Sequence, residues 1–352
     1  MTMPHSPDHT ETQPAASFAD DILAGIEQAA PISGAEAIEC DIAPKELPTG
    51  TDLHGYRILK PLGAGGFGIT YLAEEDYLSR RVVIKESFPD SLCYRQTKTL
   101  HVCLNDPDNG AANYDWARGN FLREARILAS LDHPYIAKVY SYFEANNTAY
   151  YVTEYIDGLS LGELADDYAR SGHPLSQDAL LGLMVRMLDA LDYMHNKHLL
   201  HRDIKPDNIL INKSGLPVLI DFGAARESYG DLTPTFVESQ GFTPPEQLKA
   251  DGTPGPWSDL YALGASFYYA LKGKCLPPCH QREIFDKAEP LASDPQLLAL
   301  YAPAILRSID KACRPVAEER YADAAAWLAD LNESALAPAS AQEIANASLP
   351  RA

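Results

Sequence analysis

The sequence is poor in basic residues and contains no long apolar run. It has 29 Lys and Arg against 49 Asp and Glu, a formal net charge of −20 at pH 7. This balance argues against nucleic acid or an anionic membrane as the main partner, because both attract clusters of basic side chains. No apolar run approaches the roughly 18 residues of a membrane span, and the opening MTMPHSPDHTETQP lacks both parts of a signal peptide. We therefore expect a cytoplasmic protein without membrane insertion.

Cysteine is also scarce, with 6 in 352 residues. So few cysteines in so long a chain do not make a disulfide framework. Cys275 and Cys279 are close in sequence, but no second Cys or His pair at zinc spacing accompanies them, so we interpret them as two thiols in a loop. What the chain does contain is 46% hydrophobic residues, enough for a sizeable core.

The composition changes along the chain and indicates where a packed domain begins and ends. Residues 1–50 are rich in Pro and Ala and carry nine Asp and Glu against one Lys, which is typical of a solvated tail. From 56 to 155 the pattern is mostly that of strands, with one clear helix near 121–131. Helices dominate from about Leu161 and end near Asn332, after which the composition is again that of a tail.

One part of the first tail has an apolar pattern. Phe18, Ile22 and Ile26 recur every four residues behind Ser17, which is suited to cap a helix, so we predict a short amphipathic helix at 18–30. Such a stripe needs a groove, either on this chain or on a docking partner. The alternative is a fluctuating tail, because a glycine and the surrounding acidic residues weaken the helix.

Two motifs in the second half of the chain are the most informative features of the sequence. HRDIKPDN occupies 201–208, and DFG follows at 221–223. Asp203 and Asn208 lie five residues apart on one loop, and a short hairpin brings in Asp221. Three such side chains can hold a substrate hydroxyl and Mg²⁺ around one phosphate chain. Either motif alone recurs by chance, but both in this order predict phosphoryl transfer.

A glycine-rich segment lies upstream. LGAGGFGITYLA at 62–73 places Gly63, Gly65 and Gly68 between two strand-like stretches. Without Cβ atoms, such a hairpin can lie close over a triphosphate and donate backbone N–H groups to it; a flexible turn is the alternative for this pattern alone. A strand follows, rather than the helix that a dinucleotide-binding fold requires, so we reject that fold.

A lysine and a glutamate supply the charges that an ATP site needs. Lys85 ends the apolar strand VVIK after the glycine-rich segment, which favours pairing with the α- and β-phosphates over a core strand whose lysine snorkels to solvent. That lysine needs an anion to fix it. On the helix near 121–131, Glu124 falls on the same side as the apolar Leu128, so we predict that Glu124 pairs with Lys85.

From about Tyr56 to Asn332 the chain resembles the eukaryotic-like (Hanks-type) Ser/Thr protein kinases, and GGFGITYLA, KESFP and SDLYALG look most like the bacterial branch. The resemblance implies an α+β, two-lobed protein kinase fold, with a small, mainly β N-lobe that holds one key helix and a larger, mainly α C-lobe. We therefore expect the N-lobe and hinge at 51–156, the C-lobe at 157–332 and a tail at 333–352. ATP with Mg²⁺ or Mn²⁺, and protein substrates, are implied as well.

The resemblance also implies a site for adenine. Thr153 to Ile156 match the hinge, where the Glu154 carbonyl and the Ile156 N–H are expected to bond the adenine edge. Val83 and Leu210 are expected to sandwich the ring.

The catalytic loop supplies positioning and charge neutralisation, which is most of what phosphoryl transfer demands of a protein. We expect Asp203 to accept and orient the substrate hydroxyl, and Lys205 to neutralise the transferring γ-phosphoryl group. Asn208 and Asp221 are the expected Mg²⁺ ligands. By resemblance, a Lys two positions after the Asp marks the Ser/Thr-directed class.

Further expectations concern regulation and packing. Arg202 can pair with a phosphate on the segment after the DFG motif, with Thr233 and Thr235 as first acceptors and Ser228 and Ser239 behind them. Thirty-eight residues separate Lys85 from Glu124, a long connection that includes the loop-like NDPDNGAAN at 105–113 and leaves the helix start open. We also expect Glu246 and Arg320 to form an ion pair in the C-lobe. An apolar column is expected to join the lobes, formed by Leu128, Val139, His201 and Phe222.

Two other function classes compete with this interpretation. A pseudokinase would bind ATP and a partner without turnover, but the Lys, Glu, Asp, Asn and Asp set is intact. A small-molecule phosphotransferase usually lacks the glycine-rich loop in this form and the Pro-Pro-Glu segment that ends at Glu246. We therefore favour a protein kinase with autophosphorylation and a role in bacterial intracellular signalling.

Overall fold

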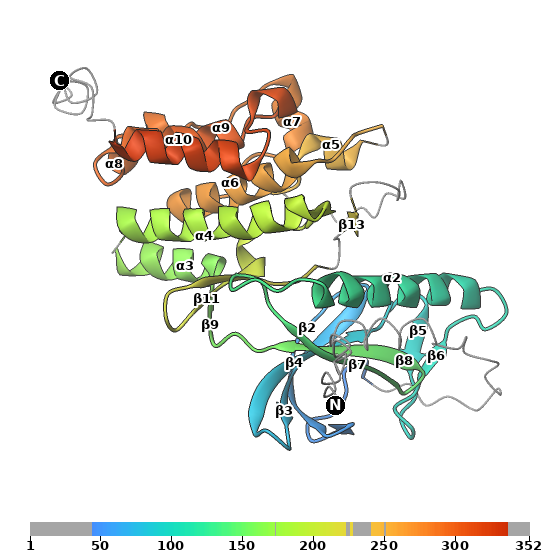
Figure 1. Cartoon of the computed structure of the whole chain (residues 1–352). Helices are drawn as coiled ribbons and strands as arrows, with labels where there is room; N and C mark the ends of the chain where they lie inside the picture. The colour runs from blue at the N-terminus through green and yellow to red at the C-terminus, as the bar shows by residue number, and fades with distance from the viewer. Residues whose placement is uncertain (1–43, 173, 223–225, 228–240, 250, 337–352) are drawn as a thin grey trace, which may run out of the picture.

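The computed structural model describes residues 44–172, 174–222, 226–227, 241–249 and 251–336. They form two lobes, one a sheet with a long helix across it and the other a larger stack of helices (Figure 1). The architecture is the predicted α+β, two-lobed fold. The predicted helix at 18–30 and the four predicted phosphorylation sites lie outside the described residues.

The small lobe is built on one antiparallel sheet of six strands, in the order β1-β2-β3-β4-β8-β7. Successive side chains of a strand point to opposite faces. Tyr150 and Val152 accordingly pack in the core on one face, and Ala149 and Tyr151 pack in the core on the other. Burial on both faces explains the continuous apolar run TAYYV. The strands are β1 (Asp52–Leu53), β2 (Tyr56–Ala64), β3 (Gly68–Glu75), β4 (Arg80–Ser87), β7 (Val139–Ala145) and β8 (Thr148–Glu154).

One long helix, α2 (Ala111–Ala129), crosses a face of this sheet (Figure 1). The predicted helix near 121–131 is present but begins ten residues earlier, inside the stretch expected to be a loop. Tyr114 explains the extension, because its ring is buried and anchors the first turn to the sheet. That burial is a tertiary contact, which the local sequence pattern could not reveal.

The connection before α2 contains an extra hairpin, β5 (Cys93–Arg95) with β6 (Val102–Leu104). Cys93 and Val102 are buried in the same core cluster as Tyr114. Leu47 joins that cluster too, although it lies inside the segment expected to be a tail. The small lobe therefore has an additional layer on the sheet face opposite Tyr151.

The large lobe is helical. A capping box starts α3 (Leu161–Ser171), because Ser160 and Glu163 bond each other's backbone N–H, and Gly172 ends it at φ 69°. The other helices are α4 (Gln177–Asn196), α5 (Pro245–Leu248), α6 (Pro256–Lys272), α7 (Cys279–Ile284), α8 (Pro295–Leu298), α9 (Pro303–Ala312) and α10 (Ala324–Leu336), with short 3₁₀ turns η1 (Pro206–Asn208), η2 (Leu291–Ser293) and η3 (Ala317–Glu319).

The last helix, α10, runs four residues beyond the predicted end near Asn332. The expected ion pair of this lobe is present, since Arg320 Nη1 lies 2.7 Å from Glu246 Oε1 and the Arg320 side chain is fully buried. No helix among the described residues has the length and apolar character needed to cross a bilayer.

Short strands of the large lobe lie on its side next to the sheet lobe (Figure 1). β11 lies between β9 and β12, and β10 pairs with β13. The 3₁₀ turn η1 leads directly into β11, so the HRDIKPDN motif occupies the loop between β10 and β11. The strands are β9 (Gly158–Ser160), β10 (Leu199–Leu200), β11 (Ile209–Asn212), β12 (Pro217–Leu219) and β13 (Arg226–Glu227).

Candidate active site

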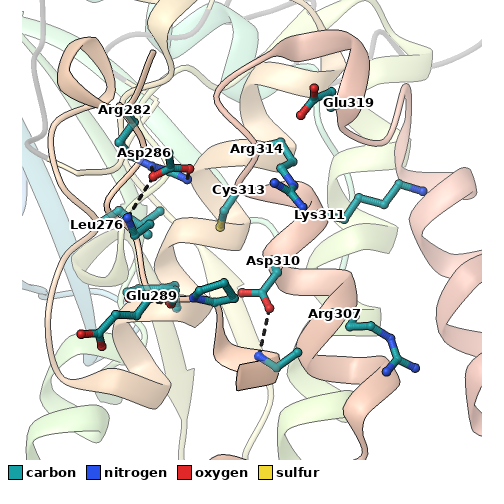
Figure 2. Close-up of a pocket in the computed structure, with 14 residues that line it drawn as sticks. Leu276, Arg282, Asp286, Glu289, Arg307, Asp310, Lys311, Cys313, Arg314 and Glu319 are labelled. Carbon is teal, nitrogen blue, oxygen red and sulfur yellow. Dashed lines mark hydrogen bonds and ion pairs between the residues drawn. The ribbon is translucent and has the colours of Figure 1, made fainter. Parts of the chain in front are cut away.

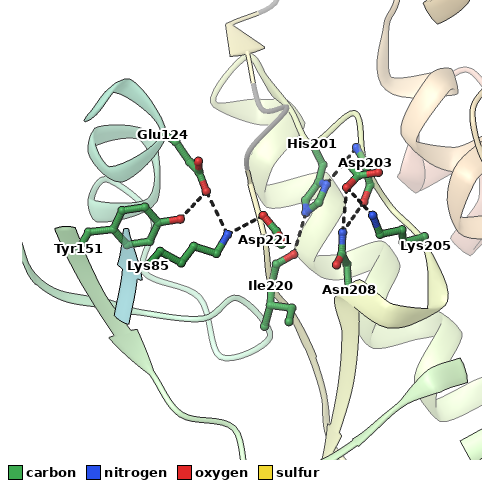
Figure 3. Close-up of polar contacts among 9 residues, drawn as sticks. All are labelled: Lys85, Glu124, Tyr151, His201, Asp203, Lys205, Asn208, Ile220 and Asp221. Atoms are coloured by element: carbon green, nitrogen blue, oxygen red, sulfur yellow. Dashed lines mark hydrogen bonds and ion pairs between the residues drawn. The ribbon is translucent and has the colours of Figure 1, made fainter. Parts of the chain in front are cut away.

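The polar residues of the HRDIKPDN loop bond one another. Lys205 Nζ donates to Asp203 Oδ2 at 2.9 Å. Asn208 Nδ2 donates to the same oxygen at 3.1 Å and to the Asp203 carbonyl at 2.8 Å (Figure 3). The side chains expected to act on the substrate hydroxyl and the γ-phosphate are thus held together by their own hydrogen bonds.

A buried carboxylate on α6 fixes this loop. Asp259 accepts the backbone N–H groups of His201 and Arg202, each at 2.9 Å, and a third bond from His195 Nε2 at 2.9 Å. Burial would raise the pKa of Asp259, but the hydrogen bond and charge of His195 hold that pKa below its ordinary value. Arg202 has a φ of 66°, which costs a non-glycine residue about 1–3 kcal/mol. Gln247 and Asp259 offset this strain by bonding its backbone.

Lys85 joins the two lobes. It lies on β4, and its Nζ is 3.3 Å from Glu124 Oε1 on α2 and 2.5 Å from Asp221 Oδ1, which follows β12 (Figure 3). Burial would lower the pKa of Lys85, but the carboxylates of Asp221 and Glu124 outweigh it and raise that pKa well above its ordinary value. Tyr151 holds Glu124 in turn, by donating its hydroxyl to the same Oε1.

Two residues of the expected apolar column, His201 and Phe222, are in contact. The rings of His201 and Phe222 have centroids 4.5 Å apart, and His201 Nε2 is 3.2 Å from the Ile220 carbonyl. Leu128 and Val139 are buried in the same core cluster as Phe222. Asp221 therefore sits between a buried strand and a buried aromatic ring, with its own φ at 62°.

The residues expected around adenine lie on strands of both lobes and on the segment that joins the lobes. Glu154 is the last residue of β8 and pairs with Val82, next to Val83 on β4. Ile156 is buried in a small cluster with Ala137 and Val218, and Leu210 packs against that cluster. The purine site that the resemblance implies therefore includes the apolar cluster around Ile156 and the end of β8 at Glu154.

Three positioning residues were not assigned by sequence reasoning. Asp259 falls within SDLYALG, a segment that the sequence marked only as a family resemblance. Tyr151 lies in an apolar strand with no local sign of a polar role, and Gln247 acts through a bond to the Arg202 carbonyl. Only their positions in the fold show that they support the catalytic loop and Glu124.

A cavity of about 790 Å³ lies elsewhere, between α7, η2 and α9 in the large lobe (Figure 2). None of the predicted site residues lines it. Its charges hold its own walls together: Arg282 pairs with Asp286 at 2.9 Å, and Asp310 accepts the N–H groups of Leu291 and Ala292. The candidate active site therefore remains the junction of the two lobes.

Comparison with known proteins agrees with this geometry. Residues 56–294 match the protein kinase domain family. The chain belongs to the protein kinase family. It is 38% identical over 232 residues to the serine/threonine-protein kinase PknA of Nostoc sp. PCC 7120, covering 62% of this chain and 37% of the relative. It is 34% identical over 286 residues to serine/threonine-protein kinase C of Synechocystis sp. PCC 6803, covering 77% of this chain and 48% of that kinase.

Solved kinase structures share the fold. The structure described as PpkA-294 in its apo form is 34% identical, covers 82% of this chain and all of its own chain, and has a TM-score of 0.71. The kinase domain of Mycobacterium tuberculosis PknI, at 23% identity and a TM-score of 0.57, shows a likeness of fold alone. The kinase domain described here spans less than half the length of the first curated relatives.

The buried His201 predicts a pH dependence of stability. Burial lowers its pKa, although Asp259 opposes this. At low pH the unfolded state therefore binds a proton that the folded state does not bind. The free energy of unfolding is expected to fall as pH drops below about 6.5. The contribution of this group is at most about 1.4 kcal/mol per pH unit. Urea unfolding between pH 7.5 and 5.5 should show a shallower loss in His201→Gln. The exposed His101→Gln is the control, and equal slopes in wild type and His201→Gln would contradict the prediction.

Proposed function

We propose that this chain is a Ser/Thr protein kinase, which transfers the γ-phosphoryl group of Mg·ATP to hydroxyls of protein substrates and of its own activation segment. The observation that carries the proposal is the meeting of charged groups from both lobes around Lys85 and Asp203 (Figure 3). Phosphoryl transfer needs cations for the phosphates and a carboxylate for the hydroxyl, and this junction offers both. Family membership supports the same conclusion.

The donor set fits Mg²⁺ or Mn²⁺. Asp221 offers carboxylate oxygens, and Asn208 offers an amide oxygen while its nitrogen donates to Asp203. Mg²⁺ prefers such oxygens and completes its shell with water and phosphate. When bound, the metal neutralises charge on the transferring phosphates.

The chain's own residues supply the remaining steps. Asp203 orients the substrate hydroxyl and takes up its proton, and the neighbouring Lys205 ammonium stabilises charge on the γ-phosphoryl group. Lys85, held by Glu124, binds the α- and β-phosphates. Because its pKa is raised, Lys85 stays charged throughout the physiological pH range.

Two glycines support the phosphate-binding role of the β2–β3 hairpin. Neither Gly63 nor Gly65 has a positive φ, and a Cβ on either would meet no atom within 4 Å. The fold itself therefore does not demand glycine there, whereas a phosphate approaching the backbone would. Gly68 differs, because its Cβ would lie 2.6 Å from the Glu86 carbonyl oxygen.

Adenine is proposed to lie between Val83 and Leu210, with its edge on the Glu154 carbonyl and the Ile156 N–H. The apolar cluster around Ile156 supports this placement. We further propose that the kinase acts in bacterial signalling in the cytoplasm, where ATP is supplied. We propose an N-lobe with hinge at 51–156 and a C-lobe at 157–332, extended upstream to the buried Leu47 and downstream to the end of α10 at Leu336.

The first test is transfer of labelled γ-phosphate from ATP to the protein itself and to a general acceptor protein. Asp203→Asn should lower the rate by about 10²–10⁴, the usual contribution of a positioned acid–base group, and removing Mg²⁺ with a chelator should abolish it. Asp167→Asn makes the same change on the exposed face of α3 and should leave the rate unaltered.

We propose that autophosphorylation occurs first on Thr233 or Thr235, where the phosphate can pair with Arg202. Mass spectrometry of the same reaction locates the phosphate. Phosphate found only elsewhere in an active sample would count against that proposal. Wild-type protein that binds ATP and transfers nothing, with either Mg²⁺ or Mn²⁺, would instead establish the pseudokinase.

The segment at 18–30 is proposed to dock a partner protein. The deletion that tests this should stop at residue 43, because Arg95 donates to the Lys45 carbonyl and Leu47 is buried in the small lobe. Loss of residues 1–43 should leave peptide phosphorylation in vitro nearly unchanged and reduce phosphorylation of partners in cells, measured by comparative phosphoproteomics. A large change in the purified enzyme would show that the segment regulates the kinase itself.

A further inference from the structure

The small lobe contains a completely buried ion pair outside the active site. Arg95 Nη2 lies 2.6 Å from Glu86 Oε2, and both side chains have 0% exposure. Burying two charges carries a large desolvation cost, which only good geometry and further hydrogen bonds offset. Removing one partner would leave the other charged and buried. The segments that this ion pair holds together therefore depend on both of its partners.

The hydrogen bonds of this pair connect several segments of the small lobe. Glu86 also accepts the hydroxyls of Tyr71 on β3, at 2.7 Å, and Tyr150 on β8, at 2.5 Å. Arg95, on the β5–β6 hairpin, donates to the Leu100 carbonyl at 2.9 Å and to the Lys45 carbonyl at 2.7 Å. The pair thus joins three neighbouring strands of the sheet to the extra hairpin and to the segment before β1.

Glu86 is also the neighbour of Lys85. Adjacent residues of a strand point to opposite faces, so Lys85 faces the active site and Glu86 faces the hairpin. The core clusters agree: Tyr151, beside Lys85 in the register, packs with the α2 core, and Tyr150, beside Glu86, packs with the hairpin core. One stretch of β4 is therefore held from both sides.

The hairpin leads directly into α2. Cys93 and Val102 pack in one cluster with Tyr114, in the first turn of α2, whose hydroxyl donates to the Asn147 carbonyl at 3.1 Å. Asn105, after the hairpin, donates its N–H back to the Leu92 carbonyl at 2.9 Å. The start of α2 is thus fixed to the same layer as Arg95. Glu124 lies ten residues beyond Tyr114, or about 15 Å, along one continuous helix.

We propose that Glu86 and Arg95 are positioning residues for phosphoryl transfer, which dock the extra hairpin and so hold α2 where Glu124 meets Lys85. The inference rests on the proposed kinase function. The pair acts through Lys85 and Glu124 and touches no substrate. A merely structural pair would stabilise the lobe without affecting the rate of the folded enzyme.

The main test is the double variant Glu86→Gln/Arg95→Met. It removes both charges together, so neither is left unpaired, and the Gln oxygen can still accept a tyrosine hydroxyl. Its kcat for a peptide should fall by about tenfold, since a small displacement of a positioned group costs up to about 10²-fold, while the peptide KM stays nearly constant. Amide hydrogen exchange, followed by mass spectrometry, should accelerate in residues 111–129 and not in α6.

A matched control is the double variant Arg282→Met/Asp286→Asn. It removes another ion pair of a buried arginine, in the large lobe, where Arg282 Nε lies 2.9 Å from Asp286 Oδ1. It should lower Tm while leaving kcat and the exchange of α2 unchanged. Arg95→Lys is a milder second variant, which keeps a cation beside Glu86 but loses bonds to the Lys45 and Leu100 carbonyls. Its kcat should fall in the same direction.

A lower Tm with unchanged kcat in both Arg95 variants would overturn the proposal, as would a fall in kcat without faster exchange in α2. The exchange measurement needs no activity. If the wild-type protein transferred no phosphate, the proposed function would fail, yet unchanged exchange in α2 would still separately refute the coupling between Arg95 and the helix.

Discussion

The ammonium group of Lys85 is the interaction on which the arrangement of the lobes depends. It bonds Glu124 in the small lobe and Asp221 in the large lobe, at 3.3 Å and 2.5 Å. Each partner has its own support: Tyr151 bonds Glu124, and buried Phe222 follows Asp221. Because a charge in a partly desolvated place is stable only when paired, strand β4, helix α2 and the DFG segment must approach together.

The charge distribution bears on the proposed ATP site, because the chain is acidic and the nucleotide is a polyanion. The net charge of −20 gives no general attraction for ATP, so the required cations must be local. Lys85 and Lys205 both lie at the junction of the lobes, each bonded to a carboxylate. Phosphates entering this junction would meet cations that are already positioned and charged. Asp259 fixes the loop beneath them through backbone bonds.

The sequence motifs predicted the lobes and their order because they encode local chemistry: glycines in a hairpin, a lysine ending a strand and an acidic loop. The boundaries depended on tertiary contacts instead. The start of α2 at Ala111 rests on burial of Tyr114, and the docking of Leu47 rests on a core that no local pattern shows. Arg95 reads in sequence as an ordinary loop arginine, and only the fold brings it to Glu86. The positioning role of Asp259 likewise depends on a loop 57 residues away.

The proposed phosphate binding requires Lys85 to exchange one of its carboxylate partners for phosphate when the nucleotide binds. A crystal structure of the chain with Mg²⁺ and a non-hydrolysable ATP analogue tests this most directly. We predict that Lys85 keeps Glu124 and lies within about 3.2 Å of an α- or β-phosphate oxygen, while Asp221 and Asn208 contact the metal. A complex in which Lys85 remains on Asp221 without touching phosphate, or in which the metal binds away from Asp221 and Asn208, would contradict the account.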